Sequence, residues 1–198
     1  MRLYMSIASP FVRKCRVVAR EKGLMGRIEE VALDFPYKGP DYTAVNPVGQ
    51  VPALVLDDGT VLTNSPVICD YLDRIGSGPR LLPPDGEAHW KTRRLEALGD
   101  QIDEMAVKII MESRRPEGER SPTWTGLWRD GLIRALDVAE REAAEPDALD
   151  LGGITLAIAT TYVGFRYPDI EWRKGRPRLS ALNDALEARD SFRETYPR

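Results

Sequence analysis

The sequence predicts a small α/β domain followed by an all-helical domain. Short strand-like and helix-like segments alternate up to about residue 80, a proline-rich connector follows at 79–84, and longer helical periodicities fill the rest of the chain. At 198 residues, with 42% hydrophobic and 30% charged residues, the chain is long enough to form two compact domains. We therefore place the α/β domain at 1–78 and the helical domain at 86–198, joined by a linker at 79–85.

The first domain reads as βαβ followed by ββα. Glycine ends both expected helices, a looser segment occupies 36–40, and a turn at Asp57-Asp58-Gly59 separates the last two strands. The expected elements are strands at about 2–6, 28–33, 53–56 and 61–62, a helix from about Phe11 to Lys22, and a helix from Ser65 to Ile75.

Apolar residues of the second domain recur at three- and four-residue steps, as they do on one face of a helix. A segment from Thr155 to about Phe165 is apolar throughout and indicates a central buried helix, while 179–188 indicates a final amphipathic one. The periodic positions of two long amphipathic helices are Leu95, Leu98, Ile102, Met105 and Ile109, and Trp124, Trp128, Leu132, Leu136 and Ala139.

Composition excludes several classes of function. The net charge is −3 without a basic stripe, which argues against a nucleic-acid partner. We find neither the apolar core of a signal peptide nor a run of membrane-spanning length, and therefore expect a cytoplasmic protein that does not bind membranes. Cys15 and Cys69 lie far apart in the sequence, without a C-x-x-C motif and with only His89 as an imidazole. Neither a zinc site nor a dithiol redox pair is supported.

The stretch from Asn46 to Leu54 ends with Val51-Pro52 at the start of an apolar strand. A proline at this position indicates a special turn, and an X-Pro bond is the one peptide bond that is often cis. With a cis bond, the N–H and C=O groups of Val51 can point outward. We therefore expect Val51 to form a docking edge for the backbone of an extended, peptide-like ligand.

Three short stretches, together with the order of elements, resemble the cytosolic glutathione S-transferase superfamily over essentially the whole chain. The resemblance implies a thioredoxin-like first domain and an all-helical glutathione S-transferase second domain. It also implies a homodimer that uses glutathione as co-substrate, without a metal, in reactions of the detoxification type. The matching stretches are Ser9-Pro10-Phe11-Val12-Arg13-Lys14, Asn46-Pro47-Val48-Gly49-Gln50-Val51-Pro52-Ala53-Leu54 and Asn64-Ser65-Pro66-Val67-Ile68.

Ser9 precedes a helix whose first turn contains Pro10, a residue suited to a position where an N–H group would have no partner. The free N–H groups and positive end of the helix dipole favour an anion such as the thiolate of glutathione. Lowering a thiol pKa of about 8.5 by two units requires about 2.7 kcal/mol. A hydrogen bond to a charged group contributes about 1.5–3 kcal/mol and a helix terminus about 0.3–1 kcal/mol, so no metal or general base is needed. The alternative is that Ser9 only caps the helix, a role that competes for the same hydroxyl.

The residue type at position 9 also indicates the reaction. Members of the resembling superfamily carry serine, tyrosine or cysteine here, and a cysteine would form mixed disulfides and favour thiol transfer. Ser9 cannot, so we expect substitution chemistry on the glutathione sulfur. Cys15 shares a helical face with Phe11, Val18 and Ala19, which indicates a core thiol rather than a nucleophile.

Asn64-Ser65-Pro66 opens the other expected helix and is a second candidate anion site. In the resembling family an acidic residue and a serine at these positions hold the γ-glutamyl end of glutathione, although Ser65 is also an ordinary N-cap candidate. Asn64 departs from the family because an amide lacks the charge of an acid, which predicts weaker glutathione binding. Lys38 could reach the glycyl carboxylate, or could simply be an exposed lysine.

The helical domain should supply the pocket for the electrophile. Met105, Ile109 and Trp124 are candidates for its lining, but residues at helical spacing are more often core. His89 is interpreted as a surface residue. At Thr155 the family often has a capping serine or threonine followed three residues later by aspartate; Ile158 replaces the acid, so the box is incomplete, and we expect Thr155 still to cap.

We therefore expect a glutathione S-transferase that activates the glutathione thiol for attack on a small hydrophobic electrophile. Val51, Asn64, Ser65 and Lys38 would bind glutathione, and Ser9 would stabilise its thiolate. Two alternatives remain: a non-catalytic binding or scaffold protein with the same fold, or a glutathione-dependent isomerase or dehalogenase.

Overall fold

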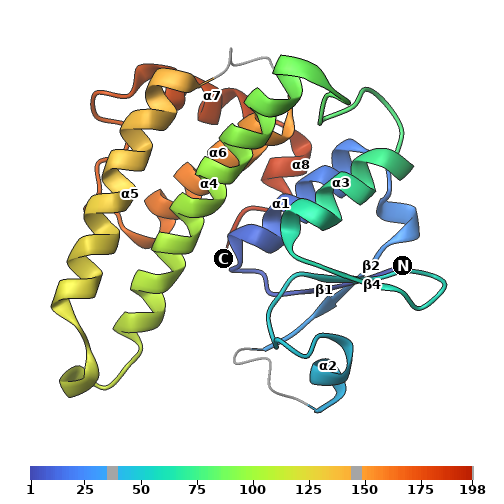
Figure 1. The fold of residues 1–198 in the computed structure, drawn as a ribbon, viewed down its shortest axis with the longest axis horizontal. Helices are drawn as coiled ribbons and strands as arrows, with labels where there is room; N and C mark the ends of the chain where they lie inside the picture. Colours follow the sequence, from blue (N-terminus) through green and yellow to red (C-terminus); the bar gives the residue numbers. More distant parts are fainter. Residues whose placement is uncertain (35–39, 144–148, 198) are drawn as a thin grey trace. The chain divides into compact units, whose positions relative to one another are not determined.

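The computed structural model describes residues 1–34, 40–143 and 149–197. Its internal contacts group the chain into two compact units, residues 1–82 together with 189–198, and residues 83–188 (Figure 1). The sequence assigned the last ten positions to the helical domain, whereas the contacts group them with the first unit. Lys38, the candidate for the glycyl carboxylate, lies outside the described residues.

The first unit is built on a four-stranded mixed sheet with the order β2-β1-β3-β4. β1 pairs in parallel with β2 and antiparallel with β3, and β3 and β4 form an antiparallel hairpin. Parallel neighbours need a crossover connection, which the first helix provides. This is the thioredoxin-like arrangement that the sequence predicts. The strands are β1 (Arg2–Met5), β2 (Glu29–Ala32), β3 (Ala53–Val55) and β4 (Val61–Thr63).

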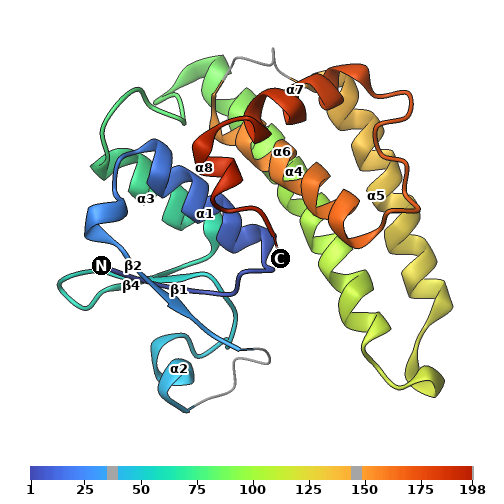
Figure 2. The same cartoon turned by 180° about the vertical axis from the view of Figure 1, so that it is seen from behind.

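Helices cover both faces of this sheet: α1 (Pro10–Glu21) and α3 (Ser65–Ile75) lie on one face and α2 (Pro40–Val45) on the other (Figures 1 and 2). The predicted bounds of α1 and α3 are confirmed within one residue. α2 was missed because six residues are too few to show a helical period. Its start is explained by Pro40, since proline fits the first turn of a helix.

The second unit is helical, as predicted. It contains α4 (Gly86–Ser113), α5 (Pro122–Glu142), α6 (Leu151–Arg166) and α7 (Pro177–Glu187). α6 is the predicted central helix: every residue from Leu151 to Val163 is buried. α4 and α6 approach so closely that a Cβ at Gly99 would lie 2.8 Å from Thr155 Cγ2, and one at Gly152 would lie 2.8 Å from Leu95 Cβ. A short 3-10 turn, η2 (Glu117–Glu119), also lies in this unit. The first unit contains a second such turn, η1 (Met25–Arg27), and a short helix, α8 (Asp190–Arg193).

The expected capping role of Thr155 is wrong. α6 begins four residues earlier, and its N-cap is Asp150, whose carboxylate accepts a 2.7 Å hydrogen bond from Gly153 N–H. Thr155 lies inside the helix, where its hydroxyl donates to Leu151 O at 2.6 Å. The helix therefore has a side-chain cap of its own and does not need an acid at Ile158, which is buried in the core.

A buried carboxylate of the first unit forms hydrogen bonds with the connector between the predicted domains. Asp73 of α3 accepts hydrogen bonds from Leu81 N–H (2.9 Å), Leu82 N–H (3.1 Å) and Arg80 Nε (2.7 Å), and Lys22 Nζ lies 3.1 Å away. Burial alone would raise the pKa of Asp73, but these hydrogen bonds outweigh it and hold the pKa below its usual range. Asp73 therefore stays ionised and links α1, α3 and the connector.

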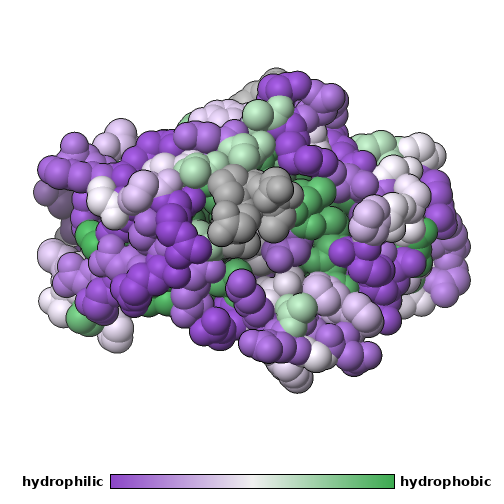
Figure 3. All heavy atoms as spheres, turned by 90° about the horizontal axis from the view of Figure 1, so that it is seen from above, coloured by the Kyte–Doolittle hydropathy of each residue, from purple (hydrophilic) through white to green (hydrophobic). Residues whose placement is uncertain are grey.

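The exposed surface is mixed in character. Figure 3 shows hydrophilic residues over most of the visible face, with hydrophobic residues in patches among them. Among the described helices, none has the combination of length and apolar character that crossing a bilayer requires.

Candidate functional site

Ser9 is the N-cap of α1, with extended backbone angles of φ −84° and ψ 124°. Its Oγ accepts a weak hydrogen bond from Val12 N–H at 3.4 Å, longer than the usual range, and its carbonyl accepts the first helical bond from Arg13 N–H at 3.0 Å. A capping hydroxyl uses an oxygen lone pair, whereas stabilising a thiolate uses the hydroxyl proton. The two roles that we treated as competing are therefore compatible.

A loop with several internal hydrogen bonds precedes β3. Asn46 is buried, its Nδ2 donates to Gln50 O at 2.7 Å, and its Oδ1 accepts from Val48 N–H at 3.2 Å. Gly49 has φ +66°, a left-handed conformation suited to glycine, and Tyr42 Oη donates a second hydrogen bond to Gln50 O. These contacts explain why the motif carries asparagine and glycine at these positions. Sequence reasoning missed the contribution of Tyr42, which comes from α2.

The Val51-Pro52 peptide bond that follows this loop is cis, the condition under which we expect Val51 to form a docking edge. Regular pairing of β3 begins at Ala53, which is in register with Tyr4 of β1 and Thr63 of β4. Within the described part of the chain, the backbone N–H and C=O groups of Val51 have no hydrogen-bond partner. Val51 therefore offers one unpaired donor and one unpaired acceptor just before β3, which suits an extended peptide.

The start of α3 differs from the expectation in one respect. Asn64, rather than Ser65, occupies the N-cap position, and it has φ +71°, which asparagine tolerates better than most residues. Ser65 is the first residue of the helix and is only 2% exposed, and its hydroxyl has no hydrogen bond to any described residue. Ser65 is thus not an ordinary N-cap, and its hydroxyl stays available beside the free N–H groups of the helix start.

Topology brings the segments that carry these positions to one end of the sheet. Tyr4 pairs with Ala53 and Ala53 pairs with Thr63, so the chain leaves β1, enters β3 and leaves β4 at the same end. The segment after β1 leads to Ser9, the segment before β3 contains Val51, and the segment after β4 leads to Ser65. This end of the sheet therefore combines two helix N-termini, two serine hydroxyls and the unpaired backbone groups of Val51, a set suited to an anionic peptide ligand.

The two cysteines lie beside each other, which their sequence positions do not reveal. Sγ of Cys15 in α1 lies 3.8 Å from Sγ of Cys69 in α3, and both residues are fully buried. Their thiols are not joined by a disulfide, and Cys15 Sγ also lies 4.0 Å from Ser65 O. The predicted core role of Cys15 is confirmed, because both thiols pack inside the interface between α1 and α3. The residues that the structure describes contain no cluster of potential ligands that could hold a metal ion.

The candidate residues of the helical domain differ in burial. Ile109 is 6% exposed and belongs to the core, which was the alternative interpretation of this position. Trp124 is 56% exposed and stacks on Trp128, with ring centroids 5.9 Å apart. His89 is half-buried, with Nδ1 2.7 Å from Pro83 O, so the expectation of a plain surface residue is only partly met.

Comparisons with known proteins agree with this geometry. A family model described as the N-terminal domain of glutathione S-transferases matches residues 8–75. The chain is 33% identical over 202 residues to the GST-like protein YibF of Escherichia coli K12, covering 100% of this chain and 98% of that protein. It is 27% identical over 208 residues to maleylacetoacetate isomerase of Pseudomonas aeruginosa, covering 100% and 96%.

Solved structures show the same similarity. A glutathione transferase family member from Pseudomonas fluorescens Pf-5, with bound glutathione, matches with a TM-score of 0.94 at 38% identity, over 100% of this chain and 98% of that chain. A structure from the same organism with bound S-(propanoic acid)-glutathione matches with a TM-score of 0.90 at 39% identity, over 100% of both chains.

Proposed function

Because this chain belongs to the glutathione S-transferase superfamily, we propose that it binds glutathione and activates its thiol for attack on a small electrophile. The observation that carries the proposal is the end of the sheet where the segments leading to α1 and α3 and the unpaired backbone of Val51 come together. The similar protein from Pseudomonas fluorescens, with glutathione bound, supports the same ligand here.

We assign the three parts of glutathione to groups of complementary chemistry. Val51 would pair with the backbone of the cysteinyl residue through its free N–H and C=O groups. Ser65 and the N–H groups at the start of α3 would take the γ-glutamyl carboxylate, with Asn64 beside the ammonium group. Lys38 would take the glycyl carboxylate. These assignments use groups of complementary charge and hydrogen-bonding capacity.

Ser9 would stabilise the thiolate by donating its hydroxyl proton to the sulfur. The oxygen can continue to accept the bond from Val12 N–H, so α1 keeps its cap while the proton points to the ligand. The helix terminus adds a favourable field for the negative charge. The thiol proton leaves to solvent, and the thiolate is then the attacking group.

The second substrate is proposed to be a small electrophile that carries a carboxylate. The support is the similar protein with bound S-(propanoic acid)-glutathione. An α,β-unsaturated acid would give such a product: the sulfur forms a bond to the β-carbon, and a solvent proton adds to the α-carbon. We also propose that the protein is cytoplasmic, that it forms a homodimer, and that its reaction serves detoxification.

A glutathione-dependent isomerase is the second candidate, and the observation that favours it is the similarity to maleylacetoacetate isomerase over the whole chain. An isomerase would add and then release the same thiolate, so glutathione would not be consumed. Measuring the loss of free thiol separates the two reactions: a transferase consumes one thiol for each product molecule, whereas an isomerase consumes none.

The test of the thiolate site is the ultraviolet absorbance of bound glutathione against pH. We expect a bound-thiol pKa well below the free value of about 8.5 in the parent. In Ser9→Ala it should rise by about one to two units, because one hydrogen bond to a charged group is lost. Ser6→Ala, in the same segment after β1, is the matched control and should leave the pKa unchanged.

The outcomes separate the parts of the proposal. Failure of the parent to bind glutathione at millimolar concentration would refute the enzyme and favour a scaffold protein with this fold. Binding with the same lowered pKa in Ser9→Ala would keep the site but remove Ser9 from its centre.

A further inference from the structure

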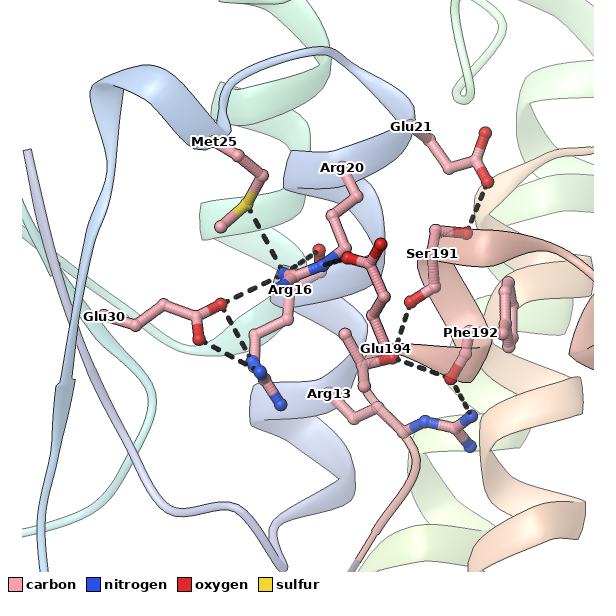
Figure 4. Close-up of polar contacts among 10 residues, drawn as sticks. Arg13, Arg16, Arg20, Glu21, Met25, Glu30, Ser191, Phe192 and Glu194 are labelled. Atoms are coloured by element: carbon pink, nitrogen blue, oxygen red, sulfur yellow. Dashed lines mark hydrogen bonds and ion pairs between the residues drawn. The ribbon is translucent and has the colours of Figure 1, made fainter.

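The last residues of the chain, 189–197, pack along α1 within the first unit, and we call them the C-terminal segment (Figure 4). At the C-terminal end of α1, Glu21 accepts hydrogen bonds from Arg189 Nη2 (2.7 Å) and Ser191 Oγ (2.5 Å). Burial would raise the pKa of Glu21, but these hydrogen bonds outweigh it and lower the pKa. On the preceding residue of α1, Arg20 Nε lies 3.0 Å from Glu194 Oε2.

The contact nearest the start of α1 is made by Arg13. This residue is 3% exposed, and its Nη2 donates to Phe192 O at 3.1 Å. The guanidinium carbon lies 5.4 Å from the ring centroids of both Phe192 and Tyr196. Cation–π contacts at this distance are attractive and strengthen when water is excluded. Phe192 is fully buried and Tyr196 is 49% exposed, so the two rings differ in how far a substitution would disturb the core.

Arg13 also connects this contact to the thiolate site. Its backbone N–H donates to Ser9 O at 3.0 Å, the first hydrogen bond of α1. The same residue is thus held through its side chain by the C-terminal segment and through its backbone by Ser9. In both ribbon views the end of the chain lies next to the start of α1 (Figures 1 and 2).

We propose that the C-terminal segment, acting through Arg13, sets the position of the first turn of α1, and that Arg13 and Tyr196 are positioning residues for the thiolate site at Ser9. This inference rests on the proposed function and extends it by assigning a role to residues that do not touch glutathione. A hydrogen bond to a thiolate depends steeply on distance and angle, so a looser first turn weakens it even when the hydroxyl is present.

Tyr196→Ala is the main test, because the half-exposed ring can be removed without opening a large cavity. We expect the pKa of bound glutathione to rise by about 0.2 to 0.7 unit, the range that helix-terminus effects cover. Tyr196→Phe keeps the ring and should restore the parent value. Arg13→Met removes the shared residue and should raise the pKa at least as far.

Arg189→Met is the matched control. It removes the contact to Glu21 from the same segment, about 18 Å along α1 from Ser9 at 1.5 Å per residue. It should lower the unfolding temperature but leave the bound-thiol pKa unchanged. A segment that only adds stability would give the same pKa in all variants.

Hydrogen exchange provides a readout without glutathione. Tyr196→Ala should speed exchange of the Arg13 amide, and Arg189→Met should speed exchange near Glu21 instead. A lowered pKa in the parent that stays the same in Tyr196→Ala and Arg13→Met would overturn the inference and leave the proposed function intact. If the parent protein does not bind glutathione, the proposed function is overturned, and the positioning role is overturned with it. This holds even if hydrogen exchange shows that the C-terminal segment stabilises α1.

Discussion

Replacing Asp73 by asparagine should destabilise the first unit more than any other single charge neutralisation on α3. The carboxylate accepts two backbone N–H groups of the connector and the Nε of Arg80, and it lies beside the buried ammonium group of Lys22. Asparagine keeps the size, but its NH2 group replaces one acceptor with a donor and removes the charge opposite Lys22. Both Asp73 and Lys22 are only 1% exposed, so solvent cannot take over the lost contacts.

The expected loss in the free energy of unfolding is about 3 kcal/mol, the low end of the cost of breaking a buried ion pair, because Lys22 Nζ keeps its 2.8 Å hydrogen bond to Pro79 O. This is a large fraction of the roughly 5–15 kcal/mol that holds a typical protein folded. Asp70→Asn, on the same helix, is the matched control. Its carboxylate is 26% exposed and lies 2.9 Å from Arg74, so we expect a loss below about 1 kcal/mol.

The pH dependence follows from the lowered pKa of Asp73. Below about pH 4 the unfolded chain binds the proton first, so the contribution of Asp73 is complete above the unfolded pKa of about 3.9 and is lost as the pH falls through the folded value. Urea unfolding at pH 7 and at steps down to pH 3 measures both effects. Equal stability of Asp73→Asn and Asp70→Asn at pH 7 would refute the reasoning.

Three further predictions concern packing and ligand binding. Cys15 and Cys69 should resist a thiol reagent in native buffer and react together on unfolding, and rapid labelling of the folded protein would contradict a closed core. Gly99→Ala should lower the free energy of unfolding by about 1–3 kcal/mol through a clash with α6; Gly126→Ala in α5, where the new Cβ meets open space, should raise it by about 0.5–1 kcal/mol, and equal thermal shifts would refute the close contact. Asn46→Ala should weaken glutathione binding several-fold by loosening the loop before β3, without changing the bound-thiol pKa, and an unchanged titration would show that the loop does not need its side-chain hydrogen bonds.

The sequence predicted the elements whose ends carry local signals. α1 and α3 begin beside proline and end near glycine, and both were found within one residue. α2 and α8 are too short to show a period, and no local pattern indicates them. The start of α6 was misplaced because Gly152 and Gly153 suggest a loop, since glycine disfavours helices. The helix nevertheless includes these glycines, because α4 comes so close that only glycine fits at position 152.

Short motifs suggest candidate residues for the site, whereas contacts between residues distant in sequence cannot be read from motifs. Ser9, Val51 and Ser65 were proposed from short motifs, and the register of the sheet places the segments that lead to them at one end of the sheet. The proximity of Cys15 and Cys69, 54 positions apart, follows only from the packing of α1 against α3. The same holds for the contact between Arg13 and the C-terminal segment, because no local rule relates positions 179 residues apart.

The grouping of residues 1–82 with 189–198 has a consequence for how the protein is made. A ribosome releases the sheet and α1 long before it reaches the residues that cover the outer side of that helix. At roughly 5–20 residues per second, the delay amounts to roughly 5–20 seconds. During this interval the nascent first unit exposes the face of α1 that Phe192 later buries, so a chain released early would leave this apolar face open to chaperones or to other nascent chains.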